Sequence, residues 1–203
     1  MNIIIVFLFS YLAGSIPFGL ILTKIFGKLD VRKIGSGNIG ATNVLRTGNK
    51  FLALCTLLFD MLKGFVPVYI SINYFPSAID LSCLFCFLGH IFPIWLKFKG
   101  GKGVATYLGI LFAISIQLSL LFIFTWIAVL LIFKYSSVSS LFSALTVLIV
   151  ATIKDTALTY IKPELRMNYD IKLILFIFFI LIVFTHRKNI FNLKNKTEHK
   201  IKI

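Results

Sequence analysis

Acidic residues are scarce in this sequence. Only seven of the 203 residues are Asp or Glu, against 21 Lys and Arg, and charged residues of both signs make up 14% of the chain. Cysteine is also rare, and Cys55, Cys83 and Cys86 all lie within apolar runs. The CxxC spacing of the last two occurs without a soluble redox fold around it, so we expect small buried side chains and no metal site. These shortages exclude a soluble redox protein.

Apolar residues dominate instead: they make up 59% of the chain, and its mean hydropathy is +0.96. A single globular core of this length cannot bury so much apolar surface, whereas a bilayer can solvate it in helices of about 20 apolar residues. The first apolar run is long for a signal peptide and no basic segment precedes it, so we expect it to stay as a membrane helix. The six apolar runs cover residues 3–25, 51–74, 81–96, 104–133, 138–153 and 171–185.

The fourth run determines how often the chain crosses the membrane. Its 30 residues form either one long tilted helix or two short helices joined near Gln117 and Ser119. With two helices there are seven crossings, and 16 Lys and Arg then share one side with only Asp30 and Glu198. Since basic loops stay in the cytoplasm, we predict an all-α polytopic membrane protein with about seven transmembrane helices, some short. Its N-terminus is expected outside and its C-terminus in the cytoplasm.

The net charge of +14 follows largely from this topology and from attraction to anionic lipid headgroups. A nucleic-acid partner would require arginine-rich segments interleaved with aromatic residues, and the sequence contains none. We therefore expect membrane lipid, and no nucleic acid, to contact the basic surface.

A first polar loop, at 27–50, contains Ile34-Gly-Ser-Gly-Asn-Ile-Gly-Ala-Thr-Asn-Val-Leu-Arg46. Its glycines let backbone N–H groups converge on an anion, and Arg46 adds a planar fork that suits phosphate. The alternative is a flexible polar connector with ordinary cytoplasmic charge. Besides Ser36 and Arg46, the candidate phosphate ligands are Gly37, Asn38, Thr42 and Asn43.

A second polar loop, at 97–106, follows Gly89-His-Ile-Phe-Pro93 and contains Gly-Gly-Lys-Gly directly before an apolar helix. Free N–H groups at a helix start and a lysine are typical of phosphate cradles. The loop is no nucleotide P-loop, because Leu96 stands where the first glycine belongs. The alternative is a glycine turn with snorkelling lysines. The candidate ligands are Gly100, Gly101, Lys102 and Gly103.

A third polar segment, at 186–198, begins with His186-Arg-Lys-Asn-Ile190. If the preceding helix runs on, His186 and Asn189 share one face. At a membrane boundary His186 acts either as a base or oxyanion donor, or as an interfacial cap of the helix C-terminus. The spacing leaves these alternatives open.

Two further polar groups lie in or beside apolar runs. Asp60 and Lys63 stand at i, i+3 and can neutralise each other's charge. Their positions are therefore equally consistent with a structural role and with a catalytic one. Tyr135-Ser-Ser-Val-Ser-Ser140 is a hydroxyl cluster that either caps a helix or supplies a phosphate ligand, for which Ser139 is the candidate.

The motifs GSGNIGATNVLR, GH-IFP with FKGGKGVAT, and HRKNI occur in this order on a small multi-pass chain. Together with Gly14-Ser-Ile-Pro-Phe-Gly19 and Asp60-Met-Leu-Lys-Gly64 they resemble, over nearly the whole chain, the bacterial acyl-phosphate:glycerol-3-phosphate acyltransferase family (PlsY). The resemblance implies one transmembrane acyltransferase domain over residues 1–203, in the bacterial cell membrane, with its active site facing the cytoplasm. The implied reaction transfers a fatty acyl group from acyl phosphate to the sn-1 hydroxyl of glycerol 3-phosphate, giving lysophosphatidic acid and phosphate.

The resemblance also implies residue roles. It makes Ser36, Arg46, His186 and Asn189 catalytic, links the glycines of the second loop to glycerol 3-phosphate binding, and gives Glu198 a structural role. Asn192 stands where Arg is common and Lys196 where Gly is common, which leaves the conformation of the tail open. The HxxxxD pattern of the other large acyltransferase class is absent, since neither His90 nor His186 is followed by Asp five residues later.

The expected partners are acyl phosphate, glycerol 3-phosphate and membrane lipid, with a functional link to the enzyme that produces acyl phosphate and with no cofactor. Holding two phosphorylated substrates with their reacting atoms adjacent is most of the catalytic task. Two other classes are weighed against this one. A transporter of a phosphorylated anion typically has inverted repeats or broken helices, and none is visible in the sequence. A purely structural membrane protein leaves the glycine-rich basic loops unexplained.

Overall fold

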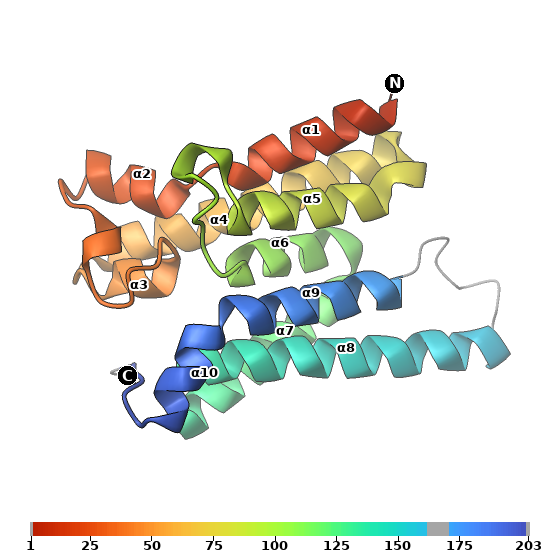
Figure 1. The fold of residues 1–203 in the computed structure, drawn as a ribbon. Coiled ribbons are helices and arrows are strands. Elements are labelled where there is room, and N and C mark those ends of the chain that lie inside the picture. The colour runs from red at the N-terminus through yellow and green to blue at the C-terminus, as the bar shows by residue number, and fades with distance from the viewer. Residues whose placement is uncertain (1, 162–170, 202–203) are drawn as a thin grey trace. The chain divides into compact units, whose positions relative to one another are not determined.

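The computed structural model describes residues 2–161 and 171–201. The described residues form helices joined by turns, and no strand occurs among them. The predicted all-α class is therefore confirmed. Two compact units, Met1–Ile114 and Ser115–Ile203, divide the chain (Figure 1) and are described separately. The predicted single domain over the whole chain stays a prediction. With seven crossings, the segment between the fifth and sixth apolar runs is predicted on the outer side. This segment contains Glu164, which lies outside the described residues.

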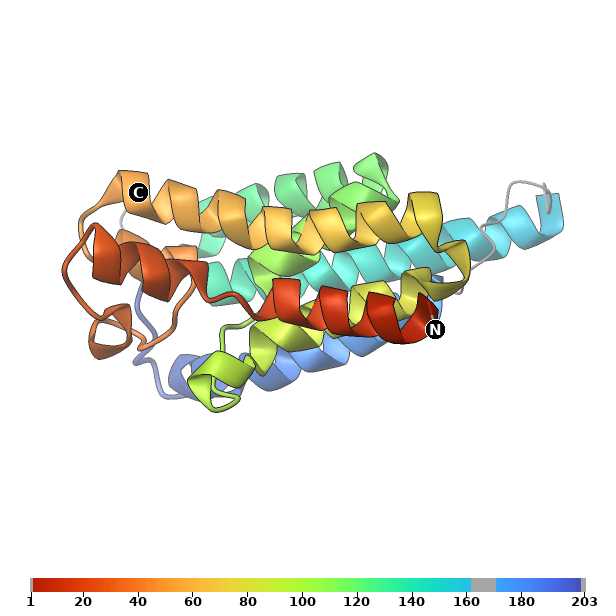
Figure 2. The same cartoon turned by 90° about the horizontal axis from the view of Figure 1, so that it is seen from above.

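The first unit is a bundle in which α1 packs on α5 and α4 on α6 (Figures 1 and 2). The short elements α2, η1 and α3, together with the connection between α5 and α6, lie at the end where α4 begins. Its elements are α1 (Asn2–Ser15), α2 (Phe18–Ile25), η1 (Val31–Lys33), α3 (Ala41–Leu45), α4 (Lys50–Tyr74), η2 (Pro76–Ala78), α5 (Ile79–Ile91), η3 (Ile94–Leu96) and α6 (Val104–Ile114).

The first apolar run is not one straight helix. Pro17 has no N–H to donate and disfavours helical geometry at Ile16, so α1 ends at Ser15 and α2 begins at Phe18, bent by 41°. The break leaves the Ile16 carbonyl without a helical partner, and the Lys63 ammonium of α4 donates to it at 2.6 Å. A buried lysine thus connects the broken first run to the long helix α4.

Glycine lets the helices of this unit approach closely. A Cβ on Gly109 of α6 would overlap the Met61 carbonyl of α4, and one on Gly64 of α4 would overlap the Thr106 carbonyl of α6. Between membrane helices such small residues allow backbone-to-backbone packing. The α4–α6 pair is therefore held in one register, which fixes where the second polar loop enters α6.

A hydrophobic cluster supports the polar end of the first unit. Residues from α2, η1, α3 and α4 form it, and Leu96 of η3 packs against it. The first and second polar loops are therefore supported by the same cluster. Its buried members are Leu20, Val31, Ile39, Val44, Leu52 and Ala53.

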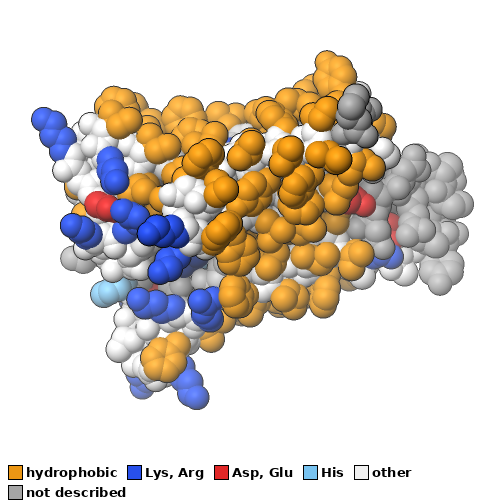
Figure 3. Space-filling model, turned by 45° about the horizontal axis from the view of Figure 1, so that its top comes forward, with side chains coloured by type: hydrophobic (Ala, Val, Ile, Leu, Met, Phe, Trp, Pro, Cys, Tyr) orange, Lys and Arg blue, Asp and Glu red, His pale blue; other side chains and the backbone are white. Residues whose placement is uncertain are grey.

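The sides of the helices in the first unit are apolar and exposed. Leu8 is 48% exposed on α1 and Leu58 is 48% exposed on α4, and hydrophobic side chains cover this face in Figure 3. Lys and Arg gather at the end that carries α2, α3 and the α5–α6 connection. An apolar wall with a basic end is the surface expected of helices that stand in a bilayer.

Among the described residues, four helical segments are long and apolar enough to cross a membrane. The number rises to six if α1 with α2, and α9 with α10, each form one bent span, while α6 has only 11 residues. Transmembrane helices of unequal length were predicted, and the structure has them. The number of crossings and the orientation stay predictions.

The second unit contains α7 (Ile116–Phe133), α8 (Ser136–Ile161), α9 (Ile171–Thr185) and α10 (Arg187–Lys194). Here α8 packs on α7 and on α9. The run at 104–133 is split, as the seven-crossing prediction requires, but the break lies at Ser115 rather than near Gln117 and Ser119. Ser115 is extended and its side chain accepts the Leu118 N–H at 3.4 Å, which makes it the N-cap of α7.

The shared face predicted for His186 and Asn189 required α9 to continue through the third motif. The helix does not continue. It ends at Thr185, and α10 leaves at an angle of 55°. His186 occupies the N-cap position of α10, and its N–H still bonds back to the carbonyls of Ile182 and Val183. His186 and Asn189 are therefore placed by a bend between two helices.

Candidate active site

One amide side chain organises the first polar loop. Asn43 is 2% exposed, and its Nδ2 donates to the carbonyls of Val31, Ile34 and Asn38 at 2.8–2.9 Å. Its Oδ1 accepts the N–H of Ser36 at 2.9 Å. Because an amide has only two N–H donors, three carbonyl acceptors use both of them. These contacts support a loop-organising role for Asn43, and its direct contact with phosphate stays a prediction.

Arg46 lies against the glycine turn that this amide holds. Gly35 has φ +54°, and a Cβ there would approach the Arg46 Cδ at 2.8 Å and Nη1 at 3.3 Å. The Arg46 Nη1 is buried, yet it has no hydrogen-bond partner among the described residues. A buried charged donor without an acceptor is expensive unless a ligand supplies one. Anion binding by Arg46 beside the Gly35–Gly37 turn stays a prediction.

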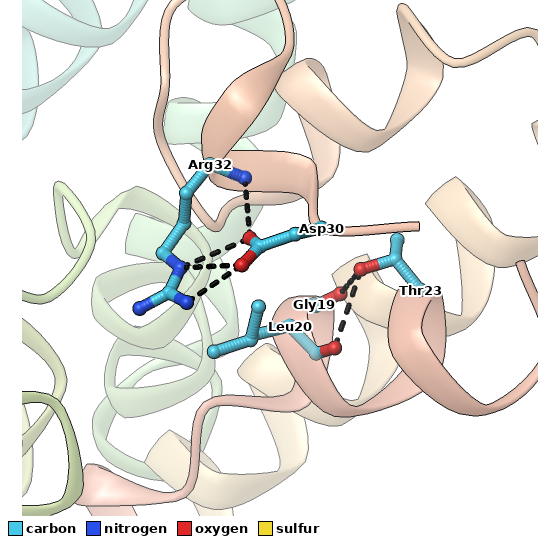
Figure 4. Close-up of polar contacts among 5 residues, drawn as sticks. All are labelled: Gly19, Leu20, Thr23, Asp30 and Arg32. Carbon is cyan, nitrogen blue, oxygen red and sulfur yellow. Dashed lines mark hydrogen bonds and ion pairs between the residues drawn. The ribbon is translucent and has the colours of Figure 1, made fainter. Parts of the chain in front are cut away.

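A second arginine of the same loop is already paired. The Arg32 guanidinium donates to the Asp30 carboxylate at 2.6–3.2 Å, and the Asp30 side chain also accepts the Arg32 N–H (Figure 4). These bonds hold the pKa of the Asp30 carboxyl well below its ordinary value. On the adjoining helix α2, the Thr23 hydroxyl donates to the Gly19 and Leu20 carbonyls (Figure 4). The Arg32 guanidinium is therefore already paired with a carboxylate.

The second polar loop is bonded to the end of α5. The N–H of Gly100 donates to the Ile91 carbonyl at 3.0 Å, and the N–H of Gly101 donates to the His90 carbonyl at 3.1 Å. These N–H groups are therefore used within the chain. The predicted role of both glycines as phosphate ligands stays a prediction, and their present contacts are with the protein.

The exit of this loop into α6 also depends on glycine. Gly103 has φ +85°, and a Cβ there would overlap the ring of Phe87. Its carbonyl accepts the N–H of Tyr107 at 2.7 Å, which closes the first turn of α6. The prediction that Gly-Gly-Lys-Gly leads directly into a helix is confirmed, because α6 begins at Val104. Lys102 precedes that start and is partly exposed.

Behind the second loop lies a buried ionic group. The Lys63 Nζ is 2.7 Å from the Asp60 Oδ1, and the His90 Nδ1 is 3.9 Å from the same oxygen. All three residues are at most 6% exposed. The Lys63 carbonyl, which Pro67 cannot bond within α4, accepts the Cys86 thiol at 2.9 Å. These contacts support the structural role predicted for Asp60 and Lys63. Sequence reasoning missed His90, although its place in the second motif was a usable signal.

The candidate residues of the third motif lie in the second unit. His186 is 1% exposed, and its Nδ1 lies 2.8 Å from the Ile182 carbonyl. A carbonyl can only accept, so the His186 Nδ1 carries the proton of this hydrogen bond. Asn189 donates from Nδ2 to the Glu198 carboxylate at 2.6 Å. Asn189 is thereby fixed by the residue for which a structural role was predicted.

Glu198 connects the tail to two helices. It accepts the hydroxyl of Ser137 in the first turn of α8 at 3.0 Å and the amide of Asn192 at 3.4 Å. A carboxylate near a helix N-terminus is favoured by the helix dipole. Ser139, one turn into α8, is fully buried and donates its hydroxyl to the Tyr135 carbonyl. Its donor is used within the helix, and phosphate binding by Ser139 stays a prediction.

Comparison with known proteins identifies the family. A family model described as glycerol-3-phosphate acyltransferase matches residues 4–196. The glycerol-3-phosphate acyltransferase of Pelagibacter ubique (strain HTCC1062) is 55% identical over 204 residues, covering 100% of both chains. That of Mesorhizobium japonicum is 49% identical over 202 residues, 98% of this chain and 96% of its own.

Two solved structures show the same fold. Both are crystal structures of PlsY, described as an integral membrane glycerol 3-phosphate acyltransferase, and each covers 100% of this chain and 96% of its own. The glycerol 3-phosphate form superposes with a TM-score of 0.88 at 32% identity, and the lysophosphatidic acid form with 0.86 at 31%. The chain therefore belongs to the glycerol-3-phosphate acyltransferase family, and it is an integral membrane enzyme.

Proposed function

We propose that this acyltransferase takes its acyl group from acyl phosphate and transfers it to the sn-1 hydroxyl of glycerol 3-phosphate. The products are lysophosphatidic acid and inorganic phosphate. Relatives solved with glycerol 3-phosphate and with lysophosphatidic acid support the acceptor and the product. The sequence motifs support the donor.

The observation that carries the proposal is the buried Arg46 Nη1 beside a glycine turn, which has no acceptor within the described part of the chain. A guanidinium fork binds phosphate oxygens in two parallel hydrogen bonds, and both substrates carry a phosphate. Lys102, ahead of α6, and the Ser36 hydroxyl, on the loop that Asn43 holds, complete the candidate anion-binding groups of the first unit. We infer that these groups of the first unit bind the phosphate of a substrate.

The proposed reaction needs little covalent help from the protein. The acceptor hydroxyl oxygen attacks the acyl carbonyl carbon, and the bond from that carbon to the phosphate oxygen breaks as the new ester forms. The phosphate leaves with the bonding electron pair, and its oxygens accept the hydroxyl proton. Because the donor is a mixed anhydride with a good leaving group, positioning and oxyanion stabilisation are the main tasks. The catalytic role of His186 stays a prediction from the third motif.

Location and supply follow from the same proposal. We place the active site at the cytoplasmic face of a bacterial cell membrane, because the predicted topology puts the basic loops there. The acyl chain remains in lipid or along the apolar helix walls. An enzyme that makes acyl phosphate must supply the donor.

The test is an acyl-transfer assay with purified protein, labelled glycerol 3-phosphate and one donor at a time. We expect lysophosphatidic acid with palmitoyl phosphate, and none with palmitoyl-CoA or palmitoyl-acyl carrier protein. NMR of the product then locates the ester at the sn-1 or sn-2 oxygen. Product from palmitoyl-CoA but not from palmitoyl phosphate would overturn the proposed donor.

A further inference from the structure

His90 occupies the space that a side chain at Gly101 would need. A Cβ built on Gly101 would overlap the His90 Nε2 and would lie 2.9–3.0 Å from two ring carbons. His90 itself is 3% exposed. The neighbour that requires glycine at this position is therefore an imidazole ring of the protein.

Two backbone carbonyls at the end of α5 bind Gly100 and Gly101. The His90 carbonyl accepts the Gly101 N–H, and the Ile91 carbonyl accepts the Gly100 N–H. A Cβ on Gly100 would overlap the His90 carbonyl oxygen. One residue of α5 thus contacts both glycines, through its carbonyl and through its ring.

The other side of the His90 ring faces the buried ionic group. Its Nδ1 is 3.9 Å from the Asp60 Oδ1, too far for a hydrogen bond, and this Nδ1 has no hydrogen-bond partner among the described residues. Asp60 is held by Lys63, which also bonds the Ile16 carbonyl at the α1–α2 break. The ring therefore stands between a rigid buried cluster and the Gly100–Gly101 turn.

We infer that His90 is a positioning residue for the Gly100–Gly103 loop: its ring acts as the buried support that Gly101 lies on, and so sets where Lys102 is presented to the phosphate of glycerol 3-phosphate. This inference rests on the proposed function for the identity of the ligand. It also gives a reason for glycine at position 101. The residue is small because of His90, rather than because phosphate must approach its backbone.

The test is a pair of single variants and their combination. Gly101→Ala puts a methyl group into the ring, so we expect the KM for glycerol 3-phosphate to rise about tenfold with little change for acyl phosphate. His90→Ala removes the support and should raise the same KM by a smaller factor. In His90→Ala/Gly101→Ala the methyl enters the vacated space, and we expect the KM to return to within about threefold of His90→Ala alone.

Gly103 provides the matched control. Its absent Cβ would overlap Phe87, not His90, so His90→Ala must not rescue Gly103→Ala. If phosphate rather than the ring crowds Gly101, the double variant will be at least as poor as the two single effects multiplied, and the inference is overturned. Rescue of both glycine variants by His90→Ala would overturn it as well, since the effect would then be unspecific.

Thermal unfolding gives a readout that does not depend on activity. Gly101→Ala should lower Tm, and the double variant should recover part of the loss. If His90→Ala does not fold, His90→Asn also lacks the Nε2 and Cε1 atoms and takes its place. Failure of the wild-type protein to make lysophosphatidic acid would reject the proposed function alone, whereas absence of Tm recovery would reject the contact.

Discussion

Arg46 and Arg32 carry the same guanidinium group in one loop but differ in their partners. Arg32 is paired with Asp30, while Nη1 of Arg46 is buried without an acceptor among the described residues. Hydrogen bonds to charged groups contribute about 1.5–3 kcal/mol each, so losing the Arg46 fork should lower kcat/KM by about 10- to 100-fold. We expect this for Arg46→Lys and for Arg46→Gln.

The matched control for this prediction is Arg32→Lys. Arg32 forms an exposed ion pair, and such pairs contribute about 0–1 kcal/mol, so activity should stay within about threefold of the wild type. Steady-state kinetics with both substrates varied provides the measurement. Similar losses for the Arg32 and Arg46 variants would contradict the special role of the unpaired nitrogen.

Lys196 is a second residue whose local backbone geometry predicts the effect of a substitution. Its φ is +57°, in the left-handed region that favours Gly. Left-handed geometry costs a residue with a Cβ about 1–2 kcal/mol, and the greater chain entropy of glycine offsets about 0.5–1 kcal/mol of that. Lys196→Gly should therefore raise the free energy of unfolding by about 0–1.5 kcal/mol. Thermal unfolding in detergent measures it, and Lys196→Ala, which keeps the Cβ, should give no gain.

The sequence was sufficient to single out important residues of the motifs, but it did not predict what those residues contact. Asn43 stood out as a polar residue in a glycine loop, and it is indeed central to that loop. Its four bonds to the surrounding backbone depend on how the chain folds between residues 31 and 43, which composition cannot reveal. Glu198 was predicted to be structural, and its contacts with Asn189 and Ser137 support that role. His90 lies near the end of α5 and Gly101 in the loop before α6. A single sequence contains no pattern that predicts their contact.

At the scale of helices, the buried Lys63 joins the α1–α2 break to α4. Lys63→Met would keep most of the volume but leave the Asp60 carboxylate without its counter-ion in an apolar interior. Removing one partner of a buried pair is destabilising by about 3–5 kcal/mol, and replacing both partners with neutral groups is far less so. We therefore expect a large loss of Tm for Lys63→Met and partial recovery in Asp60→Asn/Lys63→Met.

Lys24 provides the control for that experiment, because it is exposed in the last turn of α2. Lys24→Met should leave Tm close to the wild-type value. If the double variant were no more stable than Lys63→Met, the bond to the Ile16 carbonyl, rather than the ion pair, would be the main contribution of Lys63.

The helix breaks show where sequence patterns stop being informative. Within 104–133 nearly every residue is apolar, so periodicity cannot locate a break, and the polar Gln117 and Ser119 suggested a site two to four residues too late. The structure selects Ser115 because its side chain can cap α7. At the third motif no glycine or proline marks the end of α9, and the bend at His186 was not predictable from residue type.

For the whole molecule, composition was sufficient to predict a helical membrane protein, because the apolar share exceeds what a soluble core can bury. The arrangement of charge also predicts the orientation, since 16 of the 21 basic residues fall on one predicted side. The break at Ser115 is a necessary condition for seven crossings, but α6 has only 11 residues and does not by itself prove a separate span. Orientation therefore needs a direct measurement.

Labelling of single introduced cysteines by a membrane-impermeant maleimide in intact bacterial cells provides that measurement. With seven crossings and the N-terminus outside, Lys194→Cys in the last turn of α10 is cytoplasmic and should be protected, whereas Tyr74→Cys at the end of α4 should react. Tyr74 is 75% exposed, and the native thiols lie within helices, two of them fully buried, so background labelling should be low.

Six crossings would leave Tyr74 outside but move the tail there as well. Lys99→Cys, cytoplasmic under both topologies, is the negative control, and permeabilised cells should label all three positions. Reaction at position 194 in intact cells, with position 99 still protected, would eliminate the seven-crossing topology and with it the cytoplasmic placement of the third motif.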